Sequence, residues 1–401
     1  MTYTGNKAKR MVAEIAKFAL FAVINVAADL FRCVRGCQKS TILFESYDGA
    51  QVGGSPKAIY DYLHANHGSA YRYVWAICND ADASVSLPLD DSTTVCRYKS
   101  FRHLTASALA SVLICDTARS GLLPRPRGQL DINTWHGTSY KNLGSGSHRL
   151  MAIEKRSYMY MMKRWDYFLS GSSLFSKVVI RGQLGYPGKI LFWGTPRNDM
   201  LINSTSIDVK EIRQRIGIFD EHVLLVLYAP TWRDSGDAPI LFDIKSIRSA
   251  IERRFGRRAV IAIRSHHAQA VSSAGFDLDL GGDYDVREVM LAADVLVSDY
   301  SSIIWDYSLL RRPLFLYCPD VEKYGRDRGF IVPPSEWGFP IACNSDELVG
   351  HIESFDTERH SRAIAFHHNL YGLYEDGRAT KRIAEVIIDA LRGGCDAGTA
   401  N

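Results

Sequence analysis

Short apolar runs that end in polar clusters recur along this chain and constrain its fold more than any other feature. The clearest example is residues 295–306, VLVSDYSSIIWD, in which an apolar run meets a Ser/Asp cluster and a helical pattern then begins. Such a run predicts a buried strand, and such a cluster predicts the first turn of a helix. A strand, a tight polar turn and a helix form the βα unit of a parallel sheet.

The same pattern predicts two successive series of strands that alternate with helices. The first series has strands at residues 41–46, 73–77, 111–115, 131–136, 167–169 and 190–193. The second series has strands at 222–228, 258–264, 295–297 and 313–317. A single core rarely grows beyond about 250–300 residues, so 401 residues predict two domains with parallel sheets. We expect them at 40–200 and 201–401, with a final helix at about 380–392 packing back.

Polar clusters follow the predicted strands of both domains. They are WHG at 135–137, TWR at 231–233, RSH at 264–266 and SDYSS at 298–302. Ligands of open parallel sheets bind beyond the carboxyl ends of the strands, so we expect these clusters to face a cleft between the domains. The N–H groups at a helix N-terminus favour an anion, which predicts a phosphate at 298–302. The alternative is that these side chains only cap the helix, but the convergence of the clusters favours a phosphate.

The N-terminal segment carries most of the positive charge. Residues 1–40 hold seven basic and two acidic side chains, a net +5, whereas the whole chain has a net charge of +4. The rest therefore sums to −1, which excludes a nucleic-acid binder by charge. Residues 18–28 are apolar except for Asn25, and this run is shorter than the roughly 20 residues of a membrane span. It matches a signal-peptide core in length, but no clear small-residue cleavage site follows.

We therefore expect residues 1–39 to form a basic, apolar helix that lies on the cytoplasmic face of the membrane. The alternative is an ordinary buried helix. The eight cysteines show no zinc-ligand spacing, which predicts free thiols in a reducing compartment. No P-loop, GxSxG or HExxH motif occurs. We expect no metal site and no cofactor, although Asp299 and Asp306 are candidates for weak Mg²⁺ binding with a nucleotide.

Two histidines and three arginines stand where they could do chemistry. His136 and His266 are expected at strand ends, and histidine is the side chain best suited to move a proton near neutral pH. Arg233, Arg264 and Arg328 lie in or near turns, and guanidinium groups match phosphate oxygens. The alternatives are a hydrogen-bonded core role for each histidine and a surface ion pair for each arginine.

Six motifs occur in order: NTWHGTSYKNLG (133–144), GTPRNDML (194–201), LYAPTWRD (227–234), RSHH (264–267), VSDYSSIIWDYSLLRRPLFLY (297–317) and DRGF (327–330). Together they resemble the CDP-glycerol glycerophosphotransferase family of teichoic acid synthesis. The resemblance covers about residues 40–340, and the basic, apolar tail before them is also similar to that family. It implies a GT-B-like fold of two Rossmann-type domains, with the nucleotide held mainly by the second.

The resemblance also implies a reaction. A polyol phosphate (glycerol phosphate or ribitol phosphate) would pass from a CDP-alditol to a hydroxyl of a lipid-linked glycan or polyol-phosphate chain, with release of CMP. His136 and His266 match the family's two catalytic histidines. The residues implied to hold the nucleotide and its phosphates are Thr231, Arg233, Arg264, Ser298, Asp299, Ser301, Ser302 and Arg328. Phosphoryl transfer needs mainly positioning and charge stabilisation, which such a set supplies.

Three departures from the family pattern leave the alditol and the acceptor undefined. Gly54-Ser55-Pro56 stands where the family usually has Asp-Asn-Pro, Ser139 stands where a proline often follows WHGT, and His267 also departs. Two alternatives stay open: a GT-B glycosyltransferase that uses a nucleotide sugar, and a membrane-associated scaffold without activity. The linked WHG, APTWR and SDYSS motifs favour the transferase.

Overall fold

The chain folds into two compact units. The computed structural model describes residues 3–78, 87–88, 90–119, 122–146, 150–231, 241–264, 275–282 and 284–393. Unit 1 contains the chain up to His136, residues 143–199 and the chain from Tyr374 onward, and unit 2 contains residues 137–142 and 200–373. The chain passes from unit 1 to unit 2 between Asp199 and Met200. Two segments depart from a simple division at residue 200. The chain from Tyr374 onward belongs to unit 1, and residues 137–142 belong to unit 2.

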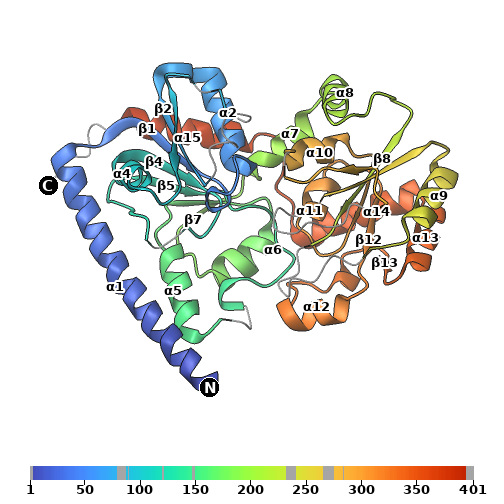
Figure 1. Ribbon diagram of the computed structural model, residues 1–401, viewed down its shortest axis with the longest axis horizontal. Coiled ribbons are helices and arrows are strands. Elements are labelled where there is room, and N and C mark those ends of the chain that lie inside the picture. Colours follow the sequence, from blue (N-terminus) through green and yellow to red (C-terminus); the bar gives the residue numbers. More distant parts are fainter. Residues whose placement is uncertain are drawn as a thin grey trace. The chain divides into compact units, whose positions relative to one another are not determined.

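Unit 1 is built on a parallel sheet of seven strands (Figure 1). In sheet order these are β3 (Thr93–Arg97), β2 (Arg72–Ile77), β1 (Gln38–Glu45), β4 (Ala110–Cys115), β5 (Leu130–Asn133), β6 (Tyr167–Leu169) and β7 (Lys189–Leu191). Every neighbouring pair runs parallel. The central strands are covered on both faces, which is why Ile42, Leu43 and Phe44 of β1 are all fully buried. The sequence did not predict β3, an edge strand rich in threonine.

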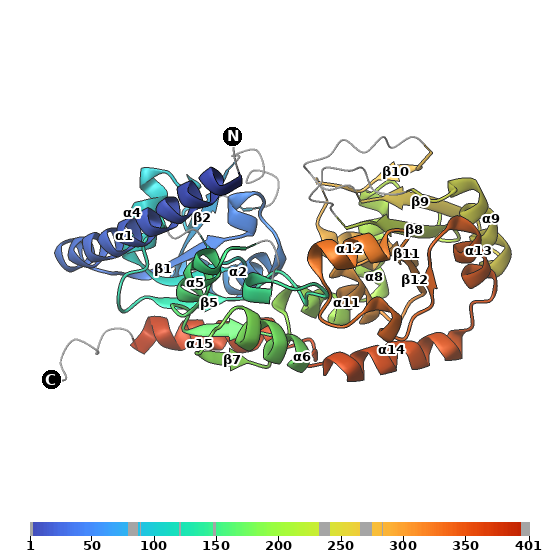
Figure 2. The same ribbon diagram turned by 90° about the horizontal axis from the view of Figure 1, so that it is seen from below.

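Some helices of unit 1 contact this sheet directly, and others pack on neighbouring helices. The helices of unit 1 are α1 (Tyr3–Arg35), α2 (Gly54–His67), α4 (Phe101–Leu109), α5 (Ala152–Met162), α6 (Ser173–Phe175), continued by the π-helix η4 (Ser176–Gln183), and α15 (Ala379–Gly393). Helix α15 lies next to α2 (Figures 1 and 2). Its residues Ile383, Ile387 and Leu391 recur every four positions, so they share one face, and they are buried in the core with Trp75. The final helix therefore completes the first domain's core.

Unit 2 has a second parallel sheet, of six strands. In order these are β10 (Leu278–Asp279), β9 (Ala259–Ile263), β8 (Leu224–Ala229), β11 (Val295–Ser298), β12 (Leu314–Tyr317) and β13 (Ile341–Ala342). Its helices are α8 (Ser206–Arg215), α9 (Ile244–Phe255), α10 (Val286–Ala292), α11 (Ile303–Ser308), α12 (Val321–Arg328), α13 (Ser345–Glu353) and α14 (Thr357–Tyr371), and the short α7 (Asp199–Asn203) spans the division. Two parallel-sheet α/β units after an apolar helix confirm the predicted fold class. The two-residue strands β10 and β13 were not predicted.

Three local expectations were wrong. Strand β5 ends at Asn133, so Trp135 and His136 lie in the following turn and not in a strand that runs to residue 136. The strand expected at 222–228 is β8, which begins two residues later, at Leu224, and ends at Ala229. Strand β7 ends two residues before the expected end at Trp193, whereas β4 ends at Cys115 as expected. Strand ends are commonly uncertain by this much.

Helix α1 is a single helix of 33 residues that packs along unit 1, against α4 and α5. Phe18 and Phe21 contact the ring of Tyr160 on α5, with ring centroids 5.4 and 6.0 Å away. Farther along, the Arg32 guanidinium donates to the carbonyl oxygens of Ala108 and Ala110. The stretch Met11–Arg35 is long and apolar enough to cross a membrane by length and composition, although 22% of the most apolar stretch in it is buried against the protein.

Candidate functional site

The turn after β5 holds His136 in a constrained backbone. Trp135 has a φ of 50°, in the left-handed region that a bulky residue rarely adopts. The Asn133 side chain stabilises this turn, because its Oδ1 accepts from Trp135 N at 2.8 Å and its Nδ2 donates to Thr117 O at 2.7 Å. Backbone strain of this kind costs about 1–3 kcal/mol and persists only where the surroundings enforce it. The WHG turn is therefore a fixed structure.

A main-chain carbonyl selects the tautomer of His136. Its Nδ1 lies 2.8 Å from the carbonyl oxygen of Asp116, which can only accept a hydrogen bond. Nδ1 therefore carries the proton in the neutral ring, and Nε2 carries the lone pair. The ring stacks on Trp135, with centroids 4.7 Å apart and 25° between the planes. The half-buried imidazole is thus oriented to accept a proton at Nε2.

Arg197, in the GTPRNDML motif, stabilises the same turn from another part of unit 1. Its side chain is buried, and Nη1 donates to the carbonyl oxygen of His136 at 2.6 Å and to the Tyr47 hydroxyl at 3.4 Å. Glu375 supports the motif, since its carboxylate accepts from Thr195 N at 2.9 Å and from Asn198 Nδ2 at 3.2 Å. The sequence alone predicted no role for Arg197, although this residue lies in a recognised motif.

Asp116 is a second residue near His136 that was not predicted from the sequence. Its fully buried carboxyl accepts from Tyr47 N at 2.8 Å and lies 3.1 Å from Ser46 Oγ. Ser46 Oγ also lies 2.9 Å from the carbonyl oxygen of Gly53, and a hydroxyl has one hydrogen for these two oxygens. A protonated Asp116 satisfies both contacts by donating to Ser46. Burial raises the pKa of Asp116 to about 7, although the ionised form would be favoured by hydrogen bonds from Tyr47 N and Ser46 Oγ and by the nearby Arg197 charge.

The strand-end rule would have found Asp116, because it directly follows β4. Tight packing around the Asp116 side chain also explains why a glycine stands at position 54. Gly54 has a φ of +62°, and a Cβ there would lie 3.3 Å from both Asp116 Oδ2 and the Tyr47 hydroxyl. The Gly-Ser-Pro departure from the family pattern thus coincides with a close approach to a buried acid.

In unit 2, Asp299 joins the ends of two neighbouring strands. Its carboxylate is buried and accepts from Thr231 Oγ1 at 2.6 Å and from Thr231 N at 2.9 Å. The buried Ser298 hydroxyl donates to the carbonyl oxygen of Ala229 at 2.7 Å. These side chains hold the loop after β8 against the loop after β11, so the positions of Thr231, Ser298 and Asp299 are structurally fixed.

The other predicted phosphate-binding residues of unit 2 lie around the same sheet edge. Arg264 Nη1 donates to the carbonyl oxygens of Leu280 and Tyr284, at 2.6 and 3.1 Å, which holds the segment after β10. Ser301 and Ser302 are partly exposed before α11, a helix of only six residues. Ser302 makes no side-chain cap, and Ser301 Oγ accepts from Ile303 N at 3.4 Å.

Arg328 is the last residue of α12, next to Gly329, whose carbonyl oxygen accepts from Asn142 N at 3.2 Å. Arg233 and His266 lie outside the described residues. Among the described residues no group of three or more His, Cys, Asp or Glu side chains is placed to hold a metal ion. The roles assigned to all these residues, and the absence of a cofactor, stay predictions.

Comparison with known proteins identifies a family whose model matches most of the chain. A family model described as CDP-Glycerol:Poly(glycerophosphate) glycerophosphotransferase matches residues 27–389. A teichoic acid poly(glycerol phosphate) polymerase of Bacillus subtilis is 26% identical over 96% of this chain and 54% of its own length. A teichoic acid ribitol-phosphate primase of Bacillus spizizenii is 34% identical over 52% of this chain and 55% of its own. The chain thus spans about half the length of these two relatives.

A solved structure agrees over nearly the whole chain. It is a histidine variant of the wall teichoic acid polymerase TagF soaked with CDPG. It superposes with a TM-score of 0.80 at 26% identity, and the match covers 98% of this chain and 100% of that one.

Proposed function

Because the chain belongs to the CDP-glycerol:poly(glycerophosphate) glycerophosphotransferase family, we propose that it transfers a polyol phosphate from a CDP-alditol to an acceptor hydroxyl and releases CMP. The family match over residues 27–389 is the observation that carries this proposal. The relatives include enzymes named for glycerol phosphate and for ribitol phosphate, so both donors are candidates.

His136 is the proposed general base. The acceptor oxygen attacks the phosphorus that bears the alditol, and Nε2 of His136 takes the hydroxyl proton. The new oxygen–phosphorus bond forms as the bond to the bridging oxygen breaks, and CMP leaves with that electron pair. The hydrogen bond from Nδ1 to Asp116 O, 2.8 Å long, supports this role because it keeps Nε2 unprotonated in the neutral ring.

The proposed binding set of unit 2 supplies charge and position. Arg264 and Arg328, with Arg233, would neutralise the pyrophosphate, and Ser301 and Ser302 would donate to its oxygens. His266 would stabilise the charge that develops on the leaving phosphate. Thr231, Ser298 and Asp299 would fix the loops that present these groups, as their mutual hydrogen bonds support.

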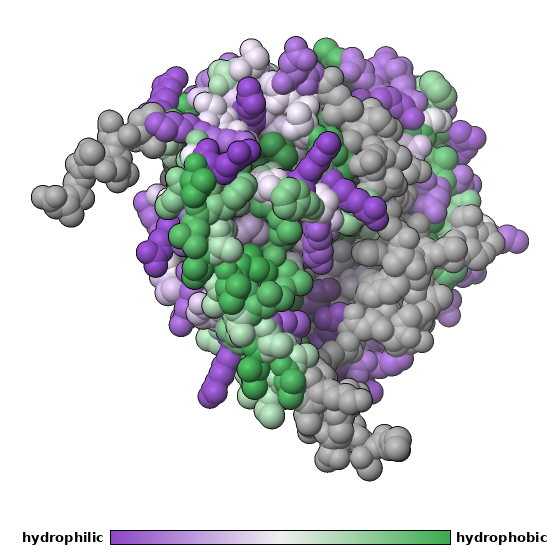
Figure 3. Space-filling model, turned by 60° about the vertical axis from the view of Figure 1, so that its left-hand side comes forward, coloured by the Kyte–Doolittle hydropathy of each residue, from purple (hydrophilic) through white to green (hydrophobic). Residues whose placement is uncertain are grey.

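Helix α1 would hold the enzyme on the membrane surface. Its outward side chains Val12, Ile15, Val23, Val26, Leu30 and Val34 are all at least half exposed, and Figure 3 shows the apolar band that they form. Its polar side chains instead bind unit 1, since Asn25 accepts from Arg125 N and Asp29 accepts from Arg127 N, both at 2.8 Å. A helix fixed along its length with one apolar face outward suits the interface and not a span.

The test is CMP release from CDP-glycerol and from CDP-ribitol in the presence of a membrane acceptor extract. We expect acceptor-dependent release with at least one donor, and a loss of about 100-fold or more in kcat for His136→Ala. His64→Ala, at a partly exposed helical histidine bonded to Asp90, is the matched control and should keep the activity. Turnover of a nucleotide sugar, with no release from either CDP-alditol, would refute the proposal.

A further inference from the structure

Residues 137–142, which we call the connecting segment, leave unit 1 directly after His136 and then return to it. Unit 1 contains the chain up to His136 and resumes at Leu143, and the residues between them belong to unit 2. Tyr140, in the middle of the connecting segment, is fully buried. The proposed general base of unit 1 is therefore joined directly to a segment that the core of unit 2 incorporates.

The Tyr140 side chain anchors the connecting segment in unit 2. His367 Nδ1 lies 3.1 Å from the carbonyl oxygen of Trp337, which only accepts, so Nδ1 carries the proton and Nε2 the lone pair. The Tyr140 hydroxyl lies 2.6 Å from this Nε2 and therefore donates to it. Burial lowers the pKa of His367 to about 3, so the ring is neutral near pH 7. The Tyr140 ring also packs on Trp337, with centroids 4.2 Å apart, so the tyrosine is held at its ring and at its hydroxyl.

The main chain of the connecting segment is bonded to the residues that directly follow Arg328. Ile331 N donates to the carbonyl oxygen of Tyr140 at 2.9 Å, and Asn142 N donates to that of Gly329 at 3.2 Å. The two stretches thus form a short antiparallel pairing. Arg328 is a proposed ligand of the donor pyrophosphate. A phosphate that orders this side chain therefore acts on the connecting segment through main-chain hydrogen bonds.

Aromatic rings join the second phosphate motif of unit 2 to the same segment. Tyr300, in the SDYSS cluster, stacks on Tyr324, with ring centroids 4.4 Å apart and 22° between the planes. The Tyr324 hydroxyl accepts from Lys141 Nζ at 3.4 Å. Both tyrosine rings also contact Phe330, whose main chain pairs with that of Lys141. The two proposed phosphate motifs of unit 2 thus converge on the connecting segment.

The far end of the connecting segment is fastened to the π-helix η4 of unit 1. Leu143 N donates to Gln183 Oε1 and Ser145 Oγ donates to Gln183 O, both at 2.7 Å. Gly144 permits this approach, because its φ is +47° and a Cβ there would lie 2.8 Å from Gln183 O. Turns of π-helix occur frequently at functional sites. The chain therefore returns to unit 1 at a fixed point.

Little chain separates the proposed base from its anchor in unit 2. Only residues 137–139 lie between His136 and Tyr140, and four residues span at most about 14 Å when fully extended. Gly137 has a φ of 126°, which favours glycine where the chain leaves the His136 turn. Arg197 holds the carbonyl oxygen of His136 on the unit 1 side. A displacement of Tyr140 therefore reaches His136 through a few backbone dihedral angles.

We propose that the connecting segment makes the general base respond to the donor: a pyrophosphate bound in unit 2 orders the DRGF loop, and residues 137–142 carry that order to His136. Tyr140 is then a positioning residue, because it acts through the backbone and not on the reacting atoms. Linkage requires the donor to bind more tightly to the state in which the segment is ordered. This inference rests on the proposed function, since it needs a donor phosphate at Arg328 and a base at His136.

The test is hydrogen–deuterium exchange of the full chain, without ligand and with saturating CDP-glycerol or CDP-ribitol. Tyr140→Phe keeps the ring and removes the hydroxyl that donates to His367. Without ligand, peptides that cover residues 133–138 should exchange up to about tenfold faster in this variant than in wild type. The donor should slow exchange at 133–138 and at 327–331 in wild type, but only at 327–331 in Tyr140→Phe.

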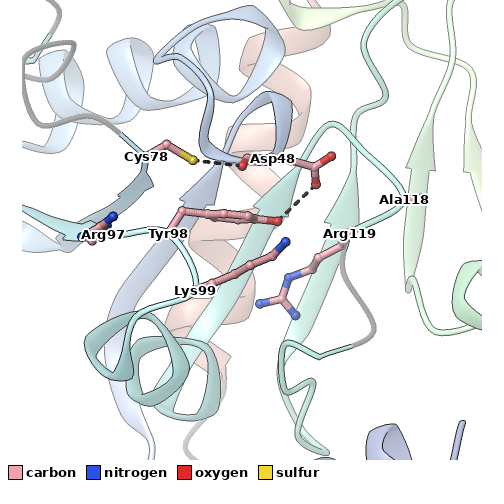
Figure 4. A pocket seen from close by; sticks show the side chains of 7 residues that line it. All are labelled: Asp48, Cys78, Arg97, Tyr98, Lys99, Ala118 and Arg119. Carbon is pink, nitrogen blue, oxygen red and sulfur yellow. Dashed lines mark hydrogen bonds between the residues drawn. The ribbon is translucent and has the colours of Figure 1, made fainter. Parts of the chain in front are cut away.

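Two other tyrosines provide matched controls. Tyr307→Phe removes a fully buried hydroxyl of unit 2 that donates to the carbonyl oxygen of Ala293 at 3.1 Å. Tyr98→Phe removes a hydroxyl of unit 1 that donates to Asp48 at 3.2 Å (Figure 4). Both hydroxyls bond outside the connecting segment, so both variants should keep the donor-induced slowing at residues 133–138.

Gln183→Ala tests the far end of the segment at a partly exposed position. It removes the side-chain acceptor of Leu143 N, so exchange at residues 133–138 should again be faster without ligand. Lys177→Ala, at an exposed position of the same π-helix, should leave that exchange unchanged. This pair keeps the proposal testable even if Tyr140→Phe fails to fold.

In turnover, Tyr140→Phe should lower kcat of CMP release about tenfold and leave the donor KM within about threefold, since the phosphate ligands stay intact. Donor-induced slowing at residues 133–138 that is the same in Tyr140→Phe as in wild type would overturn the proposal. Slowing at 327–331 alone in wild type would also overturn it. If neither donor slows exchange at 327–331, the proposed function fails, and equal ligand-free exchange in Tyr140→Phe and wild type would separately refute the anchoring role.

Discussion

The buried carboxyl of Asp116 should make stability depend on pH in a direction opposite to that of an ordinary aspartate. Burial raises its pKa from 3.8 to about 7 in the folded protein. Below pH 3.8 both folded and unfolded chains hold the proton, so stability is unaffected. As the pH rises the unfolded chain ionises first, and stability falls until the folded carboxyl ionises near pH 7. The difference between these two pKa values corresponds to a loss of about 4 kcal/mol in total.

Asp116→Asn removes the titratable carboxyl and keeps the shape of the side chain. The amide nitrogen donates to Ser46 Oγ and the amide oxygen accepts from Tyr47 N, as the protonated acid does. From the two pKa values, about 2.5 kcal/mol of the loss falls between about pH 5 and pH 8. Urea unfolding at these pH values should therefore show the variant gaining about that much over wild type as the pH rises.

Asp208→Asn is the control. The hydrogen bond from the Thr205 N–H lowers the pKa of this exposed carboxyl, so its contribution to stability is lost as the pH falls and not as it rises. Since Asp116 contacts His136 only through its main-chain carbonyl, Asp116→Asn should keep CMP release within a few-fold of wild type. A difference between wild type and Asp116→Asn that is the same at both pH values would refute the protonated carboxyl.

Three further predictions concern the His136 turn, the loops of unit 2 and helix α1. Arg197→Lys loses the paired donation to His136 O and Tyr47, so kcat of CMP release should fall about tenfold or more with the donor KM unchanged, and an unchanged kcat would contradict the positioning role. Thr231→Val removes a donor from buried Asp299 and should cost about 1–3 kcal/mol in urea unfolding, whereas Thr231→Ser should cost less. Val23→Glu/Val26→Glu on the outer face of α1 should abolish sedimentation with anionic vesicles and keep the far-ultraviolet circular dichroism; undiminished sedimentation would mean that another surface binds the membrane.

The sequence predicted the central, apolar strands well, but of the four edge strands in the described part of the chain it predicted only β7. Strands such as β8 and β11 are buried on both faces, so their apolar runs are continuous and easy to recognise. The edge strands β3, β10 and β13 are short or partly polar, and they form because a neighbouring strand offers hydrogen bonds. The residues that induce these edge strands therefore lie elsewhere in the chain.

The candidate site was predicted only in part. His136 was found because it stands in a recognisable polar cluster after a strand. Arg197 and Asp116 were missed as site residues, although one lies in a quoted motif and the other directly follows β4. Their roles depend on partners far away in the sequence: Arg197 is 61 residues from His136, and Asp116 is 69 residues from Tyr47.

The sequence by itself determined the two parallel-sheet units, the apolar N-terminal helix and the polar strand ends, because hydrophobic periodicity is a local property of the chain. Only the tertiary structure decided which polar strand ends meet. It made α15 part of the first core, fixed the His136 tautomer through Asp116 and bonded Tyr140 to His367. These arrangements follow from strand order and loop conformation, which bring together side chains that no local pattern connects.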